Sequence, residues 1–269
     1  MQAKMSNGYK ISSTLLAKQI KIQRVQKCLP VFDGGIGESP LAAPRSMVEN
    51  VKTFAHLKEY TDVRGIPRLQ AALNSDNLLV GNGLKPLLYT MQASFVKLYK
   101  EDAGIFHMLP AWTSYMEQTN IIGCQHQTVG VNPDWSSTDP ENWCKVTPEQ
   151  MDRALSEHRA SAGVNNNLVL FNNPNNPSGI IYTKQEIQDF AMVFKQHKTI
   201  VLADDIYADL VHTEYQDQFG MLANHYPEGT ITGSSLSKQF GCGGYRLGWL
   251  DFPNKDAPQD PRLQVRSER

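Results

Sequence analysis

The stretch that decides the fold is Ser234-Ser235-Leu236-Ser237-Lys238-Gln239-Phe240-Gly241-Cys242-Gly243-Gly244-Tyr245-Arg246-Leu247-Gly248-Trp249. Lys238 stands there between small hydroxyl residues and a glycine-rich turn, and Arg246 follows in the same loop. The short apolar run just before it, residues 230–232, predicts a buried strand. Taken alone, a serine- and glycine-rich loop with one lysine is more typical of an ordinary surface loop. The rest of the chain favours a functional role, because it supplies possible partners for Lys238.

Composition limits the classes of protein to consider. The 269 residues include 26 basic and 27 acidic side chains, and the net charge of -1 offers no general attraction for nucleic acid or an anionic membrane. The four cysteines and seven histidines show no spacing typical of metal ligands, so we expect no metal site. Neither an apolar signal core nor a membrane-spanning run is present, and we expect a soluble, cytoplasmic protein.

Apolar runs and helical patterns alternate along the chain. Strands are expected at 78–80, 105–109, 168–171, 199–203 and 230–232, and helices at 12–28, 44–56, 67–73, 87–98, 148–158 and 184–197. In the helix at 67–73, the expected buried face consists of Leu69, Ala72 and Leu73. The alternation predicts an α/β fold with a largely parallel sheet and helices on both faces.

Polar loops follow several of the expected strands. Gly81–Pro86 leaves a strand and opens a helix, so its backbone N–H groups could face an anion, although Pro86 stands where the dinucleotide fingerprint needs its third glycine. Trp112 follows the next strand and is either a core residue or a platform for a ring. Asn172–Gly179 predicts a rigid turn. Asp204–Tyr207 ends a buried strand, where open α/β sheets place their chemistry.

In this order, the loops resemble those of fold type I pyridoxal-phosphate enzymes, specifically the class I/II aminotransferases. The matching motifs are NNPNNPSG, DDIY, SLSK and GGYRLGW, with weaker matches in YTDVRG, GNGLKP and PAWTSY. The resemblance covers roughly residues 30–250. It implies a pyridoxal 5'-phosphate enzyme that moves an amino group between an α-amino acid and a 2-oxo acid.

The resemblance assigns the catalytic roles. Lys238 would bond covalently to the cofactor aldehyde and then carry a proton to and from the substrate Cα. Asp204 would hold the pyridine nitrogen protonated, so that the ring withdraws electrons. Tyr207 and Asn176 would both donate to the phenolic oxygen. Asp205 is expected to be structural, because strand alternation points it the other way.

The resemblance also assigns binding roles. Trp112 matches an aromatic residue that stacks on the cofactor ring, and the phosphate would be held by Gly83, Leu84, Lys85, Ser235, Ser237 and Arg246. Arginine suits phosphate because its planar fork binds two oxygens at once. Tyr60 matches a tyrosine that reaches the phosphate of a neighbouring subunit, which implies a homodimer. Gly37, together with Trp112 and Asn176, would line the substrate.

The chain also departs from the family pattern. Family members continue into a small domain that contributes an arginine for the substrate α-carboxylate, whereas Arg262, Arg266 and Arg269 lie here without motif context. We therefore expect a truncated member of the family, with a nearly complete cofactor site, an incomplete small domain and impaired turnover. The expected parts are an N-terminal arm with a small-domain segment over 1–45, a cofactor-binding large domain over 46–252 and a disordered tail over 253–269.

Two alternatives remain open at this point. A lyase or synthase of the same fold, such as a cysteine-S-conjugate β-lyase or an aminocyclopropane-carboxylate synthase, would use the same motifs. A catalytically silent cofactor-binding fragment would also carry them. The motifs do not select the substrate amino acid.

Overall fold

The computed structural model of the chain describes residues 13–31, 37–124, 128–136, 138 and 143–253. The chain divides into two compact units, Met1–Ala42 and Ala43–Arg269. The first contains helix α1 (Ser13–Gln26), as predicted, and the Arg24 side chain donates to the carbonyl of Pro30 beyond its end. The expected domain boundaries stay a prediction, and residues 254–269 of the expected tail lie outside the described residues.

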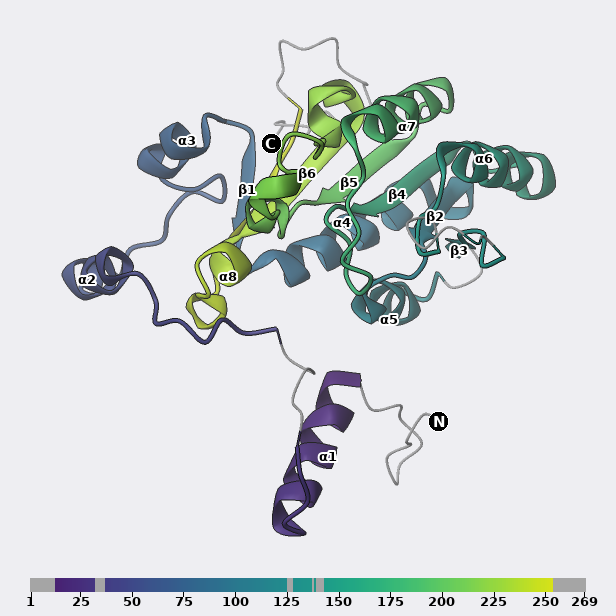
Figure 1. Cartoon of the computed structure of the whole chain (residues 1–269). Coiled ribbons are helices and arrows are strands. Elements are labelled where there is room, and N and C mark those ends of the chain that lie inside the picture. Colours follow the sequence, from purple (N-terminus) through teal and green to yellow (C-terminus); the bar gives the residue numbers. More distant parts are fainter. Residues whose placement is uncertain (1–12, 32–36, 125–127, 137, 139–142, 254–269) are drawn as a thin grey trace. The chain divides into compact units, whose positions relative to one another are not determined.

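The second unit is built on a mixed sheet. Its described strands are β1 (Leu78–Gly81), β2 (Ala103–Met108), β3 (Thr128–Val131), β4 (Asn166–Asn172), β5 (Ile200–Asp204), β6 (Thr230–Ser235) and β7 (Gly248–Asp251). They lie in the order β1-β7-β6-β5-β4-β2-β3 (Figure 1). All neighbouring pairs are parallel except the two that β7 makes with β1 and β6. The prediction of a largely parallel sheet is confirmed.

The helices of this unit are α2 (Arg45–Phe54), α3 (Pro67–Leu73), α4 (Leu84–Tyr99), α5 (Thr113–Ile122), α6 (Pro148–Ala162), α7 (Lys184–Gln196) and α8 (Leu236–Gln239). Short 3-10 turns occur at Lys100–Asp102, Ala208–Leu210, Thr213–Tyr215, Leu222–Asn224, Pro227–Gly229 and Gly243–Tyr245. Each long helix follows a predicted helical pattern except α5, which begins just after Trp112.

Alternation along the buried strands sends side chains into two separate cores. On one face, Phe106 of β2 and Phe171 of β4 pack with α6 and α7. On the other face, Ile105 of β2 and Leu202 of β5 pack with α4 and α5. Successive residues point to opposite faces because the side-chain period of a strand is two. The expected helices on both faces are confirmed.

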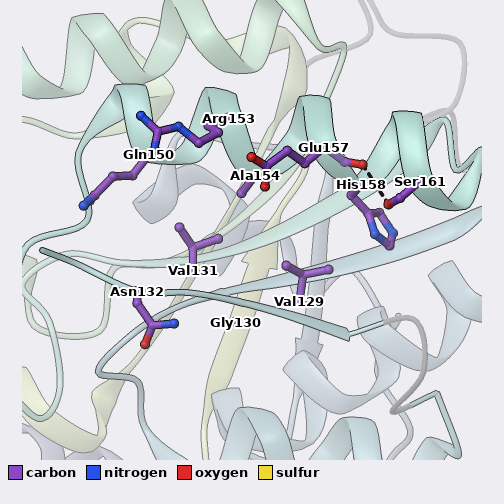
Figure 2. Close-up of a pocket in the computed structure, with 10 residues that line it drawn as sticks. All are labelled: Val129, Gly130, Val131, Asn132, Gln150, Arg153, Ala154, Glu157, His158 and Ser161. Atoms are coloured by element: carbon purple, nitrogen blue, oxygen red, sulfur yellow. Dashed lines mark hydrogen bonds between the residues drawn. The ribbon is translucent and has the colours of Figure 1, made fainter.

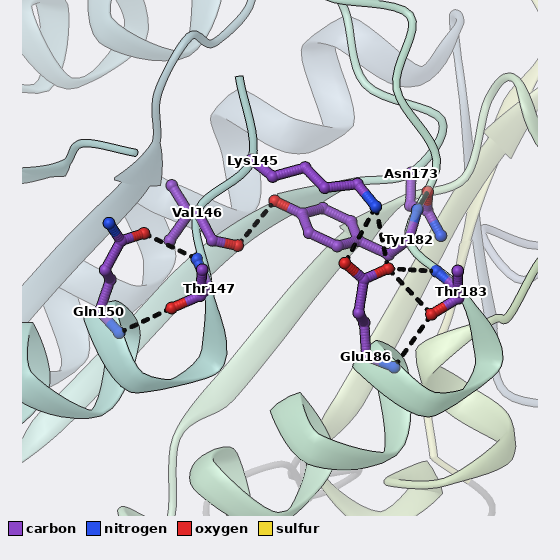
Figure 3. Close-up of polar contacts among 8 residues, drawn as sticks. All are labelled: Lys145, Val146, Thr147, Gln150, Asn173, Tyr182, Thr183 and Glu186. Atoms are coloured by element: carbon purple, nitrogen blue, oxygen red, sulfur yellow. Dashed lines mark hydrogen bonds and ion pairs between the residues drawn. The ribbon is translucent and has the colours of Figure 1, made fainter. Parts of the chain in front are cut away.

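A polar network joins the starts of α6 and α7. Thr147 caps α6 and Thr183 caps α7, each in a reciprocal capping box with the residue three positions on. Lys145 donates to both carboxylate oxygens of Glu186, at 2.9 and 3.0 Å, and the Tyr182 hydroxyl donates to the Val146 carbonyl (Figure 3). Burial raises the pKa of Glu186, but the Thr183 hydrogen bonds and the Lys145 charge outweigh it and leave the pKa lowered.

The prediction of a buried face on α3 is wrong. No residue of α3 is buried, Ala72 is exposed, and Leu69 and Leu73 are only half-buried. The helix is short, and its neighbourhood is tied to the sheet mainly through the N–H of Val80, which donates to the carbonyl of Val63. The apolar side chains of α3 therefore stay partly in water.

Two strands of the sheet are absent from the sequence-based assignment. The strand β3 is a four-residue edge strand with a glycine inside it, and β7 is equally short and follows the glycine-rich loop. Short strands with glycine carry little periodic signal, since only pairing with β2 or with β1 and β6 fixes them.

Phe190 is a sensitive point of the α7 core. Its ring contacts those of Phe171, Tyr182 and Phe194 at centroid distances of 5.2 to 5.7 Å, and it is fully buried. Phe190→Ala should lower the free energy of unfolding by about 3–5 kcal/mol, since it leaves a cavity. Met192→Ala, on the same helix but 63% exposed, should cost far less. Urea unfolding measures both, and equal losses would contradict this packing.

Candidate active site

The parallel strands β4 and β5 end at the same level, and their neighbour β6 continues to Ser235. In the register of the sheet, Asn172 of β4 lies opposite Asp204 of β5, and Asp204 lies opposite Gly233 of β6. Figure 1 shows these strands side by side in the middle of the sheet. The predicted loops that follow them therefore meet at one edge of the sheet.

Asp204 is the most buried charged residue at this edge. Its side chain is 4% exposed, it accepts a hydrogen bond from the Tyr115 hydroxyl, and it accepts a second from the Ile206 N–H at 3.3 Å. Burial raises the pKa of Asp204 to about 6, against the opposing effects of the Tyr115 and Ile206 hydrogen bonds and the Lys238 charge. The carboxyl group can therefore change its ionisation close to neutral pH.

Tyr115 is a site residue that the sequence analysis missed. It lies on α5 one helical turn after Trp112, and the two rings meet edge to face at 5.5 Å. Burial raises the pKa of Tyr115 well above its usual value, as does the negative charge of Asp204, so the hydroxyl stays a donor. The signal available in the sequence was the helical spacing from Trp112.

The neighbouring carboxyl group, Asp205, lies in a different environment. It is also buried, and its Oδ2 atom has no hydrogen-bond partner. Burial, followed by the charge of Asp204, raises the pKa of Asp205 to about 8. Lys238 acts on the pKa of Asp204 but is not among the groups that act on Asp205. This difference supports the predicted division of roles between the two acids.

Lys238 lies beside the tyrosine of the DDIY motif. Its Nζ atom is 5.9 Å from the centre of the Tyr207 ring, and its side chain is half-buried on α8. The Asn176 amide donates to the Tyr207 hydroxyl at 3.3 Å. The Ser235 hydroxyl caps α8 by accepting from the Ser237 N–H at 3.2 Å. Four polar side chains, those of Lys238, Tyr207, Asn176 and Ser235, thus lie on or next to the three predicted loops.

The start of α4 lies against Arg246. Gly83 precedes the helix with a φ of 90°, and no side chain caps the first N–H groups of α4. The Arg246 guanidinium lies against Gly83, so closely that a Cβ atom at Gly83 would overlap it. It donates to the carbonyls of Asn82 and Gly243 at 3.0 and 2.7 Å. An uncapped helix start with an arginine against it suits a phosphate.

The remaining predicted site residues are placed as follows. Trp112 is half-buried at the start of α5, and the Lys85 ammonium lies 5.1 Å from the centre of its ring. Tyr60 lies between α2 and α3 with its side chain fully exposed, so its predicted contact with a partner subunit stays a prediction. Gly37 belongs to the first unit, and its predicted substrate contact likewise stays a prediction.

A separate cavity of about 420 Å³ lies between β3 and α6. It is lined by Val129, Gly130, Val131, Asn132, Gln150, Arg153, Ala154, Glu157, His158 and Ser161, and Figure 2 shows Val129 and Val131 pointing toward α6. None of these residues belongs to the predicted site. The cavity and the polar cluster at the strand ends are therefore distinct features.

Two searches of the described residues bear on other kinds of site. The part of the chain that the structure describes has no group of three or more His, Cys, Asp or Glu side chains that could hold a metal ion. In that same part, no helix combines the length and the apolar character needed to cross a membrane.

Tyr115→Phe isolates one hydrogen bond. The change keeps the ring but removes the donor to Asp204, and that donor lowers the pKa of the carboxyl group. We expect Asp204 to titrate about one pH unit higher in this variant, as measured by carbon-detected NMR of the carboxyl group. Tyr89→Phe, at a position on α4 that is 36% exposed, is the control. An unchanged midpoint for Asp204 would show that the bond does not form in solution.

Comparison with known proteins agrees with this geometry. The model of the family "Aminotransferase class I and II" matches residues 35–256. The aspartate aminotransferase of Bacillus sp. (strain YM-2) is 26% identical over 254 residues, which cover 89% of this chain and 59% of that protein. The asparagine–oxo-acid transaminase of Streptococcus mutans is 24% identical over 261 residues, which cover 91% of this chain and 61% of that protein.

A solved structure has the same fold. The aspartate aminotransferase from Thermus thermophilus with maleate superposes with a TM-score of 0.75 at 23% identity, covering 91% of this chain and 62% of that chain. The present chain thus spans only about three fifths of the length of these relatives. Since the family model matches most of its residues, the chain belongs to the class I and II aminotransferases, whose members depend on pyridoxal phosphate.

Proposed function

We propose that the protein is a pyridoxal-phosphate-dependent aminotransferase that moves an amino group between an α-amino acid and a 2-oxo acid. One observation carries the proposal. Lys238 and Tyr207 lie 5.9 Å apart beside Asp204 at the end of β5, and the Lys238 charge lowers the pKa of Asp204, which supports a common site. A lysine beside a buried acid and a tyrosine is the set that this cofactor requires.

The residues present fit the cofactor. Its phosphate group matches the uncapped start of α4 with Arg246 against Gly83, because backbone N–H groups and a guanidinium both donate to phosphate oxygens. Ser235 and Ser237 stand at the start of α8 and could add hydroxyl donors. Trp112 is half-buried, and its ring, which lies at right angles to that of Tyr115, could present a face to the cofactor.

Asp204 tunes the electronic behaviour of the site. Bound pyridoxal phosphate withdraws electrons from the substrate Cα and so stabilises negative charge there. Asp204 would assist by keeping a proton on the pyridine nitrogen, which requires an ionised carboxylate. Because its pKa is about 6, the carboxylate is mostly ionised at pH 7, and the Tyr115 hydrogen bond favours that form.

Lys238 would bond to the cofactor aldehyde and later hold the proton of the substrate Cα. Its amine must lose its own proton for either role. Tyr207 and Asn176 already share a hydrogen bond, and their polar atoms would donate to the phenolic oxygen of the cofactor. These donors favour the ionised oxygen and thereby lower the pH at which the bound chromophore titrates.

Substrate, assembly and location extend the proposal. The relatives are named aspartate aminotransferases and an asparagine–oxo-acid transaminase, so aspartate and asparagine are the first amino donors to test. We propose a homodimer, supported by exposed apolar side chains around α2 and α3: Val51, Phe54, Leu57, Tyr60, Val63 and Ile66. A cytoplasmic location is proposed on the family resemblance alone.

Covalent labelling tests the lysine. Pyridoxal phosphate followed by borohydride should fix a pyridoxyl group to Lys238, because this amine lies beside Tyr207 and Asp204. Peptide mapping by mass spectrometry identifies the modified residue. The Lys238→Ala variant should take up no label at equal cofactor concentration. Label on Lys85 in the unmodified chain would mean that the wrong amine was chosen.

A pair of isosteric variants tests the two acids. Asp204→Asn should weaken the amino-transfer half-reaction by about 2 kcal/mol, roughly 30-fold, because a charged hydrogen bond to the cofactor is lost. Asp205→Asn should change this rate much less, since burial keeps Asp205 mostly neutral at pH 7. Stopped-flow absorbance with aspartate measures both rates. Similar losses in the two variants would reject the assignment of Asp204.

A further inference from the structure

We infer that Asn172 is a positioning residue of this site, whose single amide group fixes the backbones of Asn176 and Asp204 relative to each other. The inference rests on the proposed function and deepens it, because both residues that Asn172 holds would contact the cofactor. Neither the motif matches nor the assigned roles above give Asn172 a part in the chemistry.

The Asn172 side chain makes two hydrogen bonds to the backbone. Asn172 is the last residue of β4 and is 5% exposed. Its Nδ2 atom donates to the carbonyl oxygen of Asp204 at 2.7 Å, and its Oδ1 atom accepts from the N–H of Asn176 at 2.7 Å. One planar side chain thus links the end of β5 to the turn after β4.

An amide of this size meets both demands. Asn carries a donor and an acceptor on one rigid group, whereas an ionised Asp is an acceptor only. An apolar residue would remove the side-chain partner of the buried Asp204 carbonyl and of the part-buried Asn176 N–H. Because Asn172 lies directly opposite Asp204 in the strand register, its short side chain can reach the Asp204 carbonyl.

Both linked residues aim a side chain at the proposed cofactor. The Asn176 side chain donates to the Tyr207 hydroxyl at 3.3 Å, and the Asp204 carboxylate is held by Tyr115. Fixing the backbone of Asn176 keeps its amide near Tyr207, where the phenolic oxygen would lie. Loss of the Asn172 link should therefore weaken the donors to that oxygen.

The adjacent asparagine provides a matched control. Asn173 is 2% exposed and also makes two hydrogen bonds through its side chain. It donates to the carbonyl of Gly220 at 2.9 Å and accepts from the N–H of Tyr182 at 3.0 Å. Figure 3 shows Asn173 beside Tyr182, in the polar network at the start of α7. Asn173 therefore makes two hydrogen bonds, as Asn172 does, but they go to Gly220 and Tyr182, which have no proposed role in binding the cofactor.

The test compares Asn172→Ala with Asn173→Ala. Thermal unfolding should show a loss of stability in both, since each removes two side-chain hydrogen bonds, both buried for Asn173 and one buried and one part-buried for Asn172. The visible absorbance of bound pyridoxal phosphate should titrate about one pH unit higher in Asn172→Ala only, because weaker donors disfavour the ionised phenolic oxygen. In the chain without cofactor, amide hydrogen exchange of Asn176 should accelerate in Asn172→Ala only. If Asn172→Ala does not fold, Asn172→Ser replaces it, with a smaller upward shift expected.

The outcomes distinguish the positioning role of Asn172 from the proposed function of the whole site. A normal wild-type absorbance band with an unmoved midpoint in Asn172→Ala would overturn the positioning role alone. An equal shift in Asn173→Ala would do the same, because the effect would then reflect general loosening. A wild-type chain with no cofactor band, or a band that persists in Lys238→Ala, would reject the proposed function and with it the positioning role.

Discussion

The parallel register of β4, β5 and β6 is the constraint on which the site depends. It sets Asn172, Asp204 and Gly233 at one level, although they lie far apart in the chain. The three loops that follow have no other reason to meet, and a shift of one residue would turn the inward-facing side chains to the opposite face. Two buried cores, one on each face, hold this register in place.

Burial at the same edge gives two adjacent acids different properties. Asp204 has a pKa raised to about 6, with Tyr115 and Lys238 favouring its ionised form, whereas Asp205 has a pKa raised to about 8 without such help. At pH 7 the first is mostly charged and the second mostly neutral. Pairs of titratable groups whose environments separate their pKa values are typical of acid–base assignments in enzymes. The site thereby gains one charge at a defined place.

The sequence predicted the long elements and the residues at the strand ends, because periodic patterns and turn residues are local signals. Lys238 lies 5.9 Å from the Tyr207 ring and Asn176 donates to the Tyr207 hydroxyl, while the roles that the resemblance gives to these residues and to Asp204 stay predictions. The roles of Tyr115 and Asn172 could not be read in this way, since each depends on a partner that only the tertiary structure supplies. The same reason explains the unpredicted short strands β3 and β7, and the exposed face of α3 that the helical pattern had placed in the core.

We propose that one cofactor occupies the edge formed by the ends of β4, β5 and β6. A crystal structure of the chain grown with pyridoxal phosphate tests it most directly. We expect density that is continuous with Lys238, with the pyridine nitrogen beside Asp204 and the phosphate at the start of α4 against Arg246. Density confined to the cavity between β3 and α6, with Lys238 unmodified, would contradict it.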